Sequence, residues 1–300
     1  MNGKLVATAF ALLGVIWGTN FIFMKWAAAL ISPGQVVLLR LLCGFVPLLA
    51  FALARRSLAW RHLRHTHHFA VMALLATALY YFAFAKGAAL LASSIAGMLS
   101  GAIPLFSFVT AVVFVRGEPV NRRILLGLVV GFGGVLLIAR PWAAGGAIDP
   151  HGVLYMVAGS LSVGSSFVYA RRFLVDKGIS PVALSTYQIG CALLMLCLVT
   201  DLHGIARILD DRVALAGLVF GLGLTGTGLA FILYYFIVQK LGAVRAAGVT
   251  YIAPVVALLA GSLLAGEPVV PASLASMALI LGGVYILQTG NQAGPSNVRP

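Results

Sequence analysis

Charged residues are scarce in this chain, and long apolar segments take their place. Only 9% of the 300 residues are charged, whereas 61% are hydrophobic. An ordinary soluble domain carries about 25% charged residues. The apolar residues come in runs of about 20, the length that an α-helix needs to cross a bilayer. The period-two alternation of a membrane β-barrel is absent. The composition therefore predicts an all-α polytopic membrane protein.

Several signatures of enzymes, pumps and cofactor-binding proteins are missing as well. The cysteines Cys43, Cys191 and Cys197 lie inside apolar segments, at spacings that suggest neither zinc nor a disulfide framework. The histidines between 62 and 68 have no cysteine or carboxylate nearby in the sequence, so we expect no metal there. There is no P-loop, no catalytic triad and no His-Glu zinc motif. These absences argue against an enzyme, an ATP-driven pump and a bound cofactor.

Acidic residues are few, and none lies within an apolar segment. All seven are in predicted loops or at helix ends: Glu118, Asp149, Asp176, Asp201, Asp210, Asp211 and Glu267. A proton-coupled antiporter usually needs a carboxylate at membrane depth, where proton and substrate can exchange. The sequence therefore argues against a proton-exchanging multidrug mechanism and against a permanently cationic substrate. A histidine, a water or a loop carboxylate remains an alternative route for coupling.

The apolar segments can be counted because turn-forming residues separate them. Breakers such as Ser32-Pro33-Gly34 and Ser180-Pro181 interrupt the pattern at regular intervals. We predict ten membrane helices, at residues 5–28, 34–54, 67–90, 94–116, 120–140, 151–172, 181–200, 212–239, 243–265 and 269–289.

The same Gly-Glu-Pro motif, preceded by an apolar segment with a proline, occurs in each half of the chain. Gly117-Glu118-Pro119 follows a segment that contains Pro104, and Gly266-Glu267-Pro268 follows one that contains Pro254, about 150 positions later. Five crossings in each half would turn the second copy upside down, as in many secondary transporters. We predict a first repeat at 1–140, an inverted second repeat at 141–290 and a disordered tail at 291–300. Pro104 and Pro254 would kink their helices, either as hinges that gate alternating access or as static bends.

Basic residues mark one side of the predicted membrane. Most Lys and Arg lie in alternate loops counted from the N-terminus, among them Lys4, Arg55, Arg61 and Arg64. The positive-inside rule then places both termini in the cytoplasm. The net charge of +13 follows from this bias and does not require a nucleic-acid partner. We interpret the basic segment 61–68 as one that touches anionic headgroups.

Arg40 is the one basic residue predicted to lie well inside a membrane helix. In one interpretation it is structural: its guanidinium snorkels outward, or binds exposed carbonyls at a broken helix, near Glu267 on the same side of the membrane. In the other it contacts a substrate carboxylate. Polar and aromatic side chains on six helices also predict an amphipathic cavity, although Ser and Thr can equally bond their own helix carbonyls.

At these residues the chain resembles the drug/metabolite transporter superfamily, and within it the ten-helix EamA type. The resembling residues are Trp17-Gly18-Thr19-Asn20-Phe21, Arg40, Ala102-Ile103-Pro104 with Gly117-Glu118-Pro119, and Ala253-Pro254 with Gly266-Glu267-Pro268. The resemblance implies two five-helix repeats, a cavity lined mainly by helices 1, 3, 4, 6, 8 and 9, and metabolite export. Within the family the chain looks closest to the YddG-type aromatic amino-acid exporters. Small multidrug members of the superfamily use a glutamate in helix 1, which this chain lacks.

We therefore expect a monomeric inner-membrane exporter of aromatic and other large neutral amino acids. Depth, helix face and resemblance together select the candidate substrate-binding residues: Trp17, Tyr80, Phe84 and Tyr251 for the apolar side chain, Asn20, Ser162, Ser166 and Thr227 for the ammonium and carboxylate groups, and Met98 in the cavity wall. The alternatives are an exporter of other metabolites or drugs, a nucleotide-sugar carrier, and a membrane-embedded assembly partner without transport activity.

Overall fold

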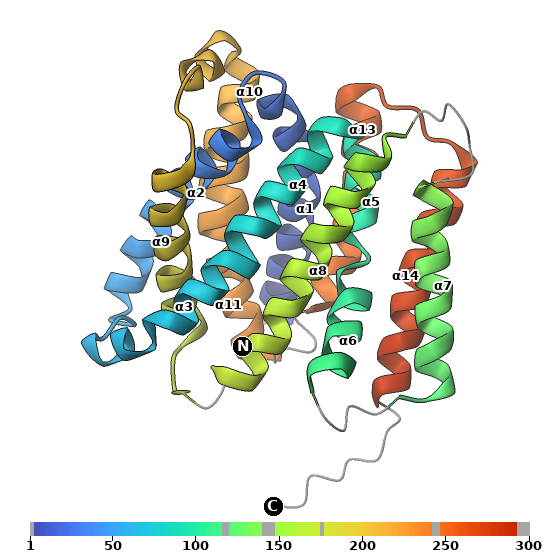
Figure 1. The fold of residues 1–300 in the computed structure, drawn as a ribbon, viewed down its shortest axis with the longest axis horizontal. Coiled ribbons are helices and arrows are strands. Elements are labelled where there is room, and N and C mark those ends of the chain that lie inside the picture. Colours follow the sequence, from blue (N-terminus) through green and yellow to red (C-terminus); the bar gives the residue numbers. More distant parts are fainter. Residues whose placement is uncertain (1–2, 116–119, 140–147, 175–176, 242–246, 293–300) are drawn as a thin grey trace, which may run out of the picture.

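The computed structural model describes residues 3–115, 120–139, 148–174, 177–241 and 247–292. Within these residues there are ten helical segments long and apolar enough to cross a bilayer, five before residue 140 and five after residue 148. No strand occurs in the described part of the chain. The segments form one helical bundle, in which α1 begins and α14 ends at the same lower face (Figure 1). The prediction of an all-α polytopic fold is confirmed.

Two of the first five spans are interrupted. The elements of this half are α1 (Gly3–Ala28), α2 (Pro33–Ala54), the 3₁₀ helix η1 (Trp60–His65), α3 (Thr66–Ala73), the π-helical segment η2 (Leu74–Ala78), α4 (Leu79–Leu90), α5 (Ser93–Ser100), α6 (Ile103–Phe114) and α7 (Arg122–Ala139). The third span is thus a chain of 3₁₀, α and π turns from Trp60 to Leu90. The fourth span breaks between α5 and α6.

The second half has interruptions in its third and fourth spans as well. Its elements are α8 (Pro150–Phe173), α9 (Pro181–Val199), the 3₁₀ helix η4 (Ile205–Asp210), α10 (Arg212–Ala216), the π-helical segment η5 (Gly217–Leu229), α11 (Ala230–Leu241), the 3₁₀ helix η6 (Ala247–Tyr251), α13 (Ile252–Ala265) and α14 (Pro271–Gln292). Irregular turns therefore recur in corresponding spans of the two halves. The Gly117-Glu118-Pro119 copy of the repeated motif lies outside the described residues.

The predicted breakers begin helices because their side chains satisfy free backbone N–H groups. Ser32 Oγ accepts from Gln35 N at 3.3 Å while Gln35 Oε1 accepts from Ser32 N at 3.0 Å, which forms a capping box before α2. Ser180 Oγ accepts from Ala183 N at 3.2 Å at the start of α9. Loop acids do the same: Asp149 Oδ1 accepts from His151 N at 2.8 Å, and this bond lowers the pKa of the Asp149 carboxyl. The carboxylates of these loops thus serve helix ends rather than the membrane interior.

Glycines join α7 to α14, which stand side by side at one edge of the bundle (Figure 1). A Cβ atom on Gly283 would overlap the backbone N and Cα of Gly131. A Cβ on Gly127 would lie 2.6 Å from the backbone N of Leu287. Small residues at such spacings let helix backbones approach closely in membranes. The Gly127-x3-Gly131 pattern therefore packs two helices within the chain.

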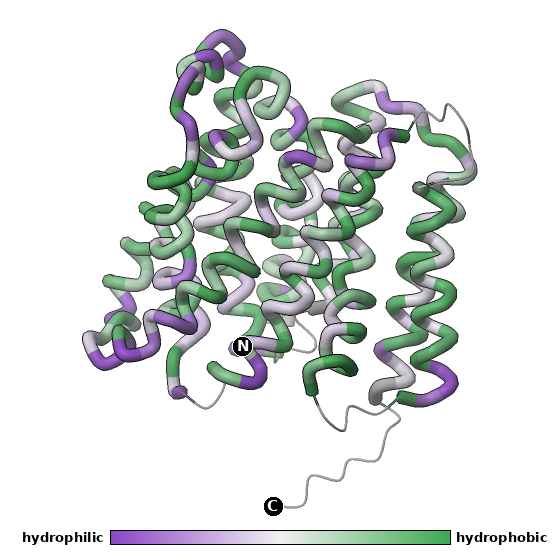
Figure 2. The backbone as a smooth tube through the Cα atoms, in the orientation of Figure 1, coloured by the Kyte–Doolittle hydropathy of each residue, from purple (hydrophilic) through white to green (hydrophobic). Residues whose placement is uncertain are grey.

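Polar residues gather at the two ends of the bundle, and an apolar belt surrounds its middle (Figure 2). Large apolar side chains on this belt are exposed, for example Val129 on α7, Leu198 on α9 and Leu263 on α13. A soluble protein of this size would not leave so many of them facing water. The belt is the surface expected of a protein whose surroundings are lipid.

Candidate functional site

Arg40 lies at the centre of a polar cluster where α2 meets α1, α4 and η5. It follows the start of α2 by seven residues, which is roughly 10 Å along the helix axis. Its side chain is buried, since the residue is only 3% exposed. The guanidinium donates from Nε to Thr227 Oγ1 at 2.9 Å and from Nη2 to the Gly226 carbonyl at 3.2 Å. One arginine thus ties α2 to η5 deep inside the protein.

Two further helices complete the surroundings of the guanidinium. With its amide oxygen turned toward α2, Asn20 of α1 accepts from Arg40 Nη2 at 3.2 Å and donates to the Ile16 carbonyl at 3.1 Å. Arg40 Cζ lies over the ring of Tyr81 of α4, 3.9 Å from the ring centroid. Such a cation–π contact is favourable when the charge is removed from water.

The partners of Arg40 are all neutral. Among the described residues the carboxylates form salt bridges with Lys25 and His151 only, and none reaches Arg40. Neutral dipoles and an aromatic face offset part of the cost of burying a cation, which is several kcal/mol for an unpaired ion. The net positive charge remains, so the cluster favours an anionic group beside Arg40.

The local backbone is what brings Thr227 to Arg40. A Cβ atom on Gly44 of α2 would lie 2.5 Å from Thr227 Cβ, so only a glycine there lets α2 and η5 touch. Thr227 Oγ1 also donates to the Leu222 carbonyl, five residues earlier, at 2.9 Å, within the π-helical segment. π-helical turns are rare and are frequent at functional sites. Sequence reasoning missed this element, although its five glycines between 217 and 228 were a visible signal.

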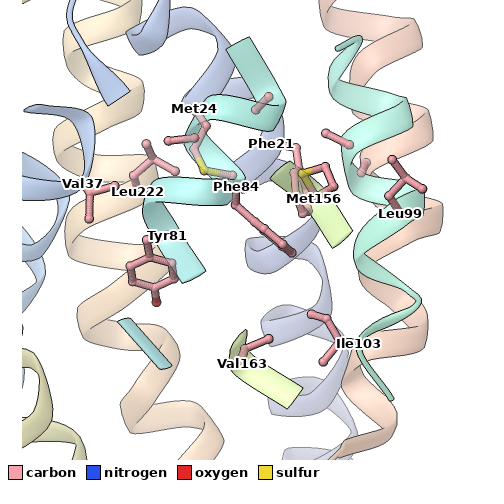
Figure 3. Close-up of a cluster of buried hydrophobic side chains, with 14 of the residues drawn as sticks. Phe21, Met24, Val37, Tyr81, Phe84, Leu99, Ile103, Met156, Val163 and Leu222 are labelled. Atoms are coloured by element: carbon pink, nitrogen blue, oxygen red, sulfur yellow. The ribbon is translucent and has the colours of Figure 1, made fainter. Parts of the chain in front are cut away.

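Aromatic side chains continue from the Tyr81 ring into the buried apolar core, and Figure 3 shows Phe21, Tyr81 and Phe84 among them. Phe84 of α4 lies with its ring centroid 5.9 Å from that of Phe21 and 4.5 Å from that of Tyr80. Tyr80 lies in turn 4.8 Å from Tyr81, whose ring faces Arg40. Met98 of α5 is fully buried in the same apolar core. The structure therefore brings four candidate residues, Asn20, Thr227, Tyr80 and Phe84, around Arg40 and its aromatic border.

The remaining candidates lie apart from this cluster. Trp17 belongs to a separate apolar group and pairs with Tyr234 of α11, with 5.9 Å between ring centroids. On α8, Ser162 Oγ donates to the Leu75 carbonyl of η2 at 2.7 Å, whereas Ser166 Oγ donates to the Val163 carbonyl of its own helix at 2.6 Å. The Tyr251 hydroxyl is buried without a hydrogen-bond partner. Ser166 is occupied by its own helix, the alternative that applies to any serine in a helix.

The two gating candidates lie beside helix breaks rather than inside continuous helices. Pro104 is in the first turn of α6, after the turn at Gly101 and Ala102 that ends α5. Pro254 is in the first turn of α13, directly after the 3₁₀ helix η6. Proline is tolerated in the first turn because the N–H that it lacks would have no partner there. The kinks predicted in mid-helix are thus breaks that precede each proline.

Glu267 occupies a different place from the one that sequence reasoning considered for it. It does not lie beside Arg40 but accepts from Lys25 Nζ at 3.1 Å, at the end of α1. Its two oxygens also accept from Ser93 N at 2.7 Å, Ser93 Oγ at 3.0 Å and Ser94 N at 2.9 Å, at the start of α5. Burial opposes ionisation, but the bonds from Ser94, Ser93 and Lys25 outweigh it and lower the pKa of Glu267 to about 2. The second Gly-Glu-Pro motif therefore caps a helix of the first half.

Comparison with known proteins identifies the class of protein to which this architecture belongs. Residues 4–140 and 150–289 each match the EamA-like transporter family, one match in each half of the chain. The chain belongs to this family, and it is a multi-pass membrane transporter. That assignment is consistent with the absence of enzyme signatures in the sequence.

Full-length relatives carry the same description. An uncharacterized transporter of Archaeoglobus fulgidus is 24% identical over 92% of this chain and 96% of its own length. The uncharacterized inner membrane transporter YedA of Escherichia coli is 24% identical over 95% of this chain and 90% of its own length. A solved crystal structure aligns with a TM-score of 0.59 and 22% identity over 97% of this chain and 99% of the other, so the fold is shared. None of these names specifies an amino-acid substrate.

Proposed function

We propose that this transporter exports aromatic and other large neutral amino acids by alternating access. The observation that carries the proposal is the buried guanidinium of Arg40, which has neutral partners on three helices and no carboxylate among the described residues. A substrate carboxylate would supply the missing negative charge. Arginine suits that role because its planar guanidinium can bind a carboxylate through two hydrogen bonds.

The groups around Arg40 suit the other parts of such a substrate. Asn20 and Thr227 carry oxygen atoms that can accept from an ammonium group. Tyr80 and Phe84 offer aromatic faces on the α4 side, where a large apolar side chain would lose contact with water. Trp17 and Tyr251 would have to approach from their separate positions when the bundle rearranges, since the central residues are closed off from solvent in this conformation.

The breaks in the fourth and ninth spans support alternating access. Discontinuous helices at the centre of inverted repeats are typical of secondary transporters, because they allow one half-helix to move against the other. The described acids, Asp149, Asp201, Asp210, Asp211 and Glu267, all lie outside the ten spans. We therefore propose a carrier without an intramembrane carboxylate relay for protons.

The alternative substrates fit the centre less well. A nucleotide sugar carries two phosphates and would favour several cations, whereas Arg40 is the one buried Lys or Arg among the described residues. A cationic drug would meet an unneutralised positive charge. We further propose that the protein resides in a bacterial inner membrane as a monomer with both termini in the cytoplasm, an orientation supported by the distribution of Lys and Arg.

Competition for transport tests the substrate without altering the protein. The purified transporter in liposomes should take up labelled phenylalanine, and unlabelled phenylalanine and leucine should compete. Phenylalaninol, which lacks the carboxylate, should compete at least about tenfold more weakly, because a charge-assisted contact contributes about 1.5–3 kcal/mol. Equal competition by phenylalaninol would refute the contact with Arg40. Uptake of nucleotide sugars or cationic drugs in place of amino acids, or stimulation by a proton gradient, would refute the wider proposal.

Variants test the residues. Arg40→Gln should abolish uptake, whereas Arg122→Gln, which removes an exposed arginine at the start of α7, should leave it unchanged. Asn20→Ala should weaken uptake through loss of its contact with the cluster, and Trp17→Ala should do so only if Trp17 reaches the substrate. Size-exclusion profiles and melting temperatures check that each variant folds. Normal uptake by folded Arg40→Gln protein would leave Arg40 with a structural role alone.

A further inference from the structure

A second group of basic residues without a described carboxylate partner lies at the end of the bundle where α2 passes into α3. A pocket of about 210 Å³ there is lined by Arg61, His62, Arg64 and His65 of η1 together with Lys177 and Gly178 of the segment between α8 and α9. The two segments are more than 100 residues apart in the sequence. The pocket therefore exists only in the folded protein.

The walls of this basic pocket are held in place by the rest of the bundle. The Tyr187 hydroxyl of α9 accepts from the Ala59 N–H at 3.1 Å and donates to the Ala59 carbonyl at 3.2 Å, which fixes the chain just before η1. Tyr187 also meets the His62 ring edge-on, with 5.9 Å between centroids. On the opposite wall, Gly178 has a φ of +65°, a conformation that glycine adopts without strain.

The charge of the pocket is not balanced by the described residues. Arg61, Arg64 and Lys177 form no salt bridge with a described carboxylate. Arg64 Nε donates to His65 Nε2 at 2.9 Å, which leaves its terminal nitrogens available. The lining contains three side chains that are positive at neutral pH and no acid. Such a pocket attracts an anion.

His62 supplies a second, independent observation at this pocket. The residue is 6% exposed, and its Nδ1 is buried without a hydrogen-bond partner. Buried polar atoms are almost always hydrogen-bonded, so an unpartnered one points to a group that the protein binds. A protonated Nδ1 would donate to an oxygen of the bound anion.

The position of the pocket indicates where the anion comes from. On the same 3₁₀ helix, Trp60 is 89% exposed and Leu63 is 43% exposed, although both are large apolar side chains. Tryptophan at the end of a membrane helix is typical of the headgroup level of a bilayer. Arg61 and Arg64 are thus each adjacent in the sequence to a residue that would insert among lipids.

We propose that this basic pocket binds the phosphate group of an anionic phospholipid headgroup. Arg61, Arg64 and Lys177 supply the charge, and His62 supplies a directed hydrogen bond. The bound lipid connects η1 to the segment between α8 and α9. It would stabilise the packing of the third span against the seventh, independently of what the transporter carries.

The test measures lipid binding to the whole protein. Wild-type protein in detergent is titrated with phosphatidylglycerol or with phosphatidylcholine, and bound lipid is counted by native mass spectrometry together with the melting temperature. We expect selective retention of phosphatidylglycerol and a rise in melting temperature. The combined Arg61→Gln, Arg64→Gln and Lys177→Gln variant should bind it roughly a hundredfold more weakly, since each basic residue near a headgroup contributes about a fivefold factor. His62→Phe, which keeps an aromatic ring against Tyr187, should weaken binding several-fold.

A matched control removes the same charge elsewhere. The combined Arg122→Gln, Arg123→Gln and Lys240→Gln variant alters three exposed basic residues outside the pocket and should bind phosphatidylglycerol as the wild type does. Equal loss in both triple variants would mean diffuse attraction to the whole surface and would overturn the proposal. Unchanged binding in the pocket variant would do the same. Inorganic phosphate at matched ionic strength is the third arm, and stabilisation by phosphate without any effect of the lipid would assign the pocket to a soluble anion instead.

Discussion

Glu267 allows the most quantitative prediction, because four hydrogen bonds to its carboxylate are described. Replacement by Gln keeps the size of the side chain but removes the charge and one acceptor. At least one of the N–H groups of Ser93 and Ser94 would then face an amide N–H and remain unsatisfied. The ordinary pKa of 4.5 falls to about 2 in the folded protein, which corresponds to about 3 kcal/mol of stabilisation by the ionised form. We therefore expect Glu267→Gln to lower the free energy of unfolding by about 2–4 kcal/mol.

The pH dependence gives the sign of this effect. Because the folded state lowers the pKa, the stabilisation is fully present above pH 4.5 and is lost as the pH falls toward about 2. The melting temperature of the wild type in detergent, followed by tryptophan fluorescence, should therefore fall toward that of Glu267→Gln on acidification. Lys25→Met should cost less, roughly 1 kcal/mol, because Lys25 is 35% exposed and the serine donors remain. Equal melting temperatures of wild type and Glu267→Gln at neutral pH, or a difference that does not shrink in acid, would refute the reasoning.

Three further changes have calculable outcomes. Thr227→Val removes the acceptor of Arg40 Nε without changing the shape of the side chain, so the free energy of unfolding should fall by about 1–3 kcal/mol in a thermal unfolding experiment. An unchanged free energy of unfolding would mean that the bond is not formed. Gly283→Ala should lower the free energy of unfolding by about 1–3 kcal/mol, because the added Cβ would overlap the backbone of α7. Gly282→Ala, where a Cβ would meet no atom within 4 Å, should be neutral or slightly stabilising. Similar melting temperatures of the two variants would argue against the close contact between the helices. Tyr187→Phe removes the hydrogen bonds between the Tyr187 hydroxyl and Ala59, so the free energy of unfolding in chemical denaturation should fall by about 1 kcal/mol. An unchanged denaturation midpoint would contradict those bonds.

Local sequence patterns were sufficient to predict the membrane spans and the residues at which several of them begin. The structure has ten apolar helical spans where the lengths of the apolar runs predict them. Ser32 and Ser180 cap the helices that begin at the Ser-Pro motifs. These features depend on neighbours a few residues away, which the sequence displays directly. The recurrence of Pro104 and Pro254 at matching positions was also visible as a repeat, although the sequence predicted kinks inside continuous helices and the structure has breaks before each proline.

The candidate site was only partly within reach of such reasoning. Asn20 and Thr227 were selected by depth and helix face, and the structure brings both to Arg40. Trp17 shares a predicted face with Asn20, yet it packs in another apolar group against Tyr234. Which neighbour a residue meets depends on where a third helix lies, and periodicity contains no information about that.

By itself, the sequence determined that this is a helical membrane protein with ten spans in two similar halves and almost no negative charge inside. Those properties follow from composition and from local hydrogen bonding. Only the tertiary structure decided that Glu267 pairs with Lys25 and Ser93 instead of Arg40, and that Arg40 meets a π-helical turn. Each of these contacts joins residues 174 to 242 positions apart, and the physical reason is that a buried charge finds its partners through packing across helices.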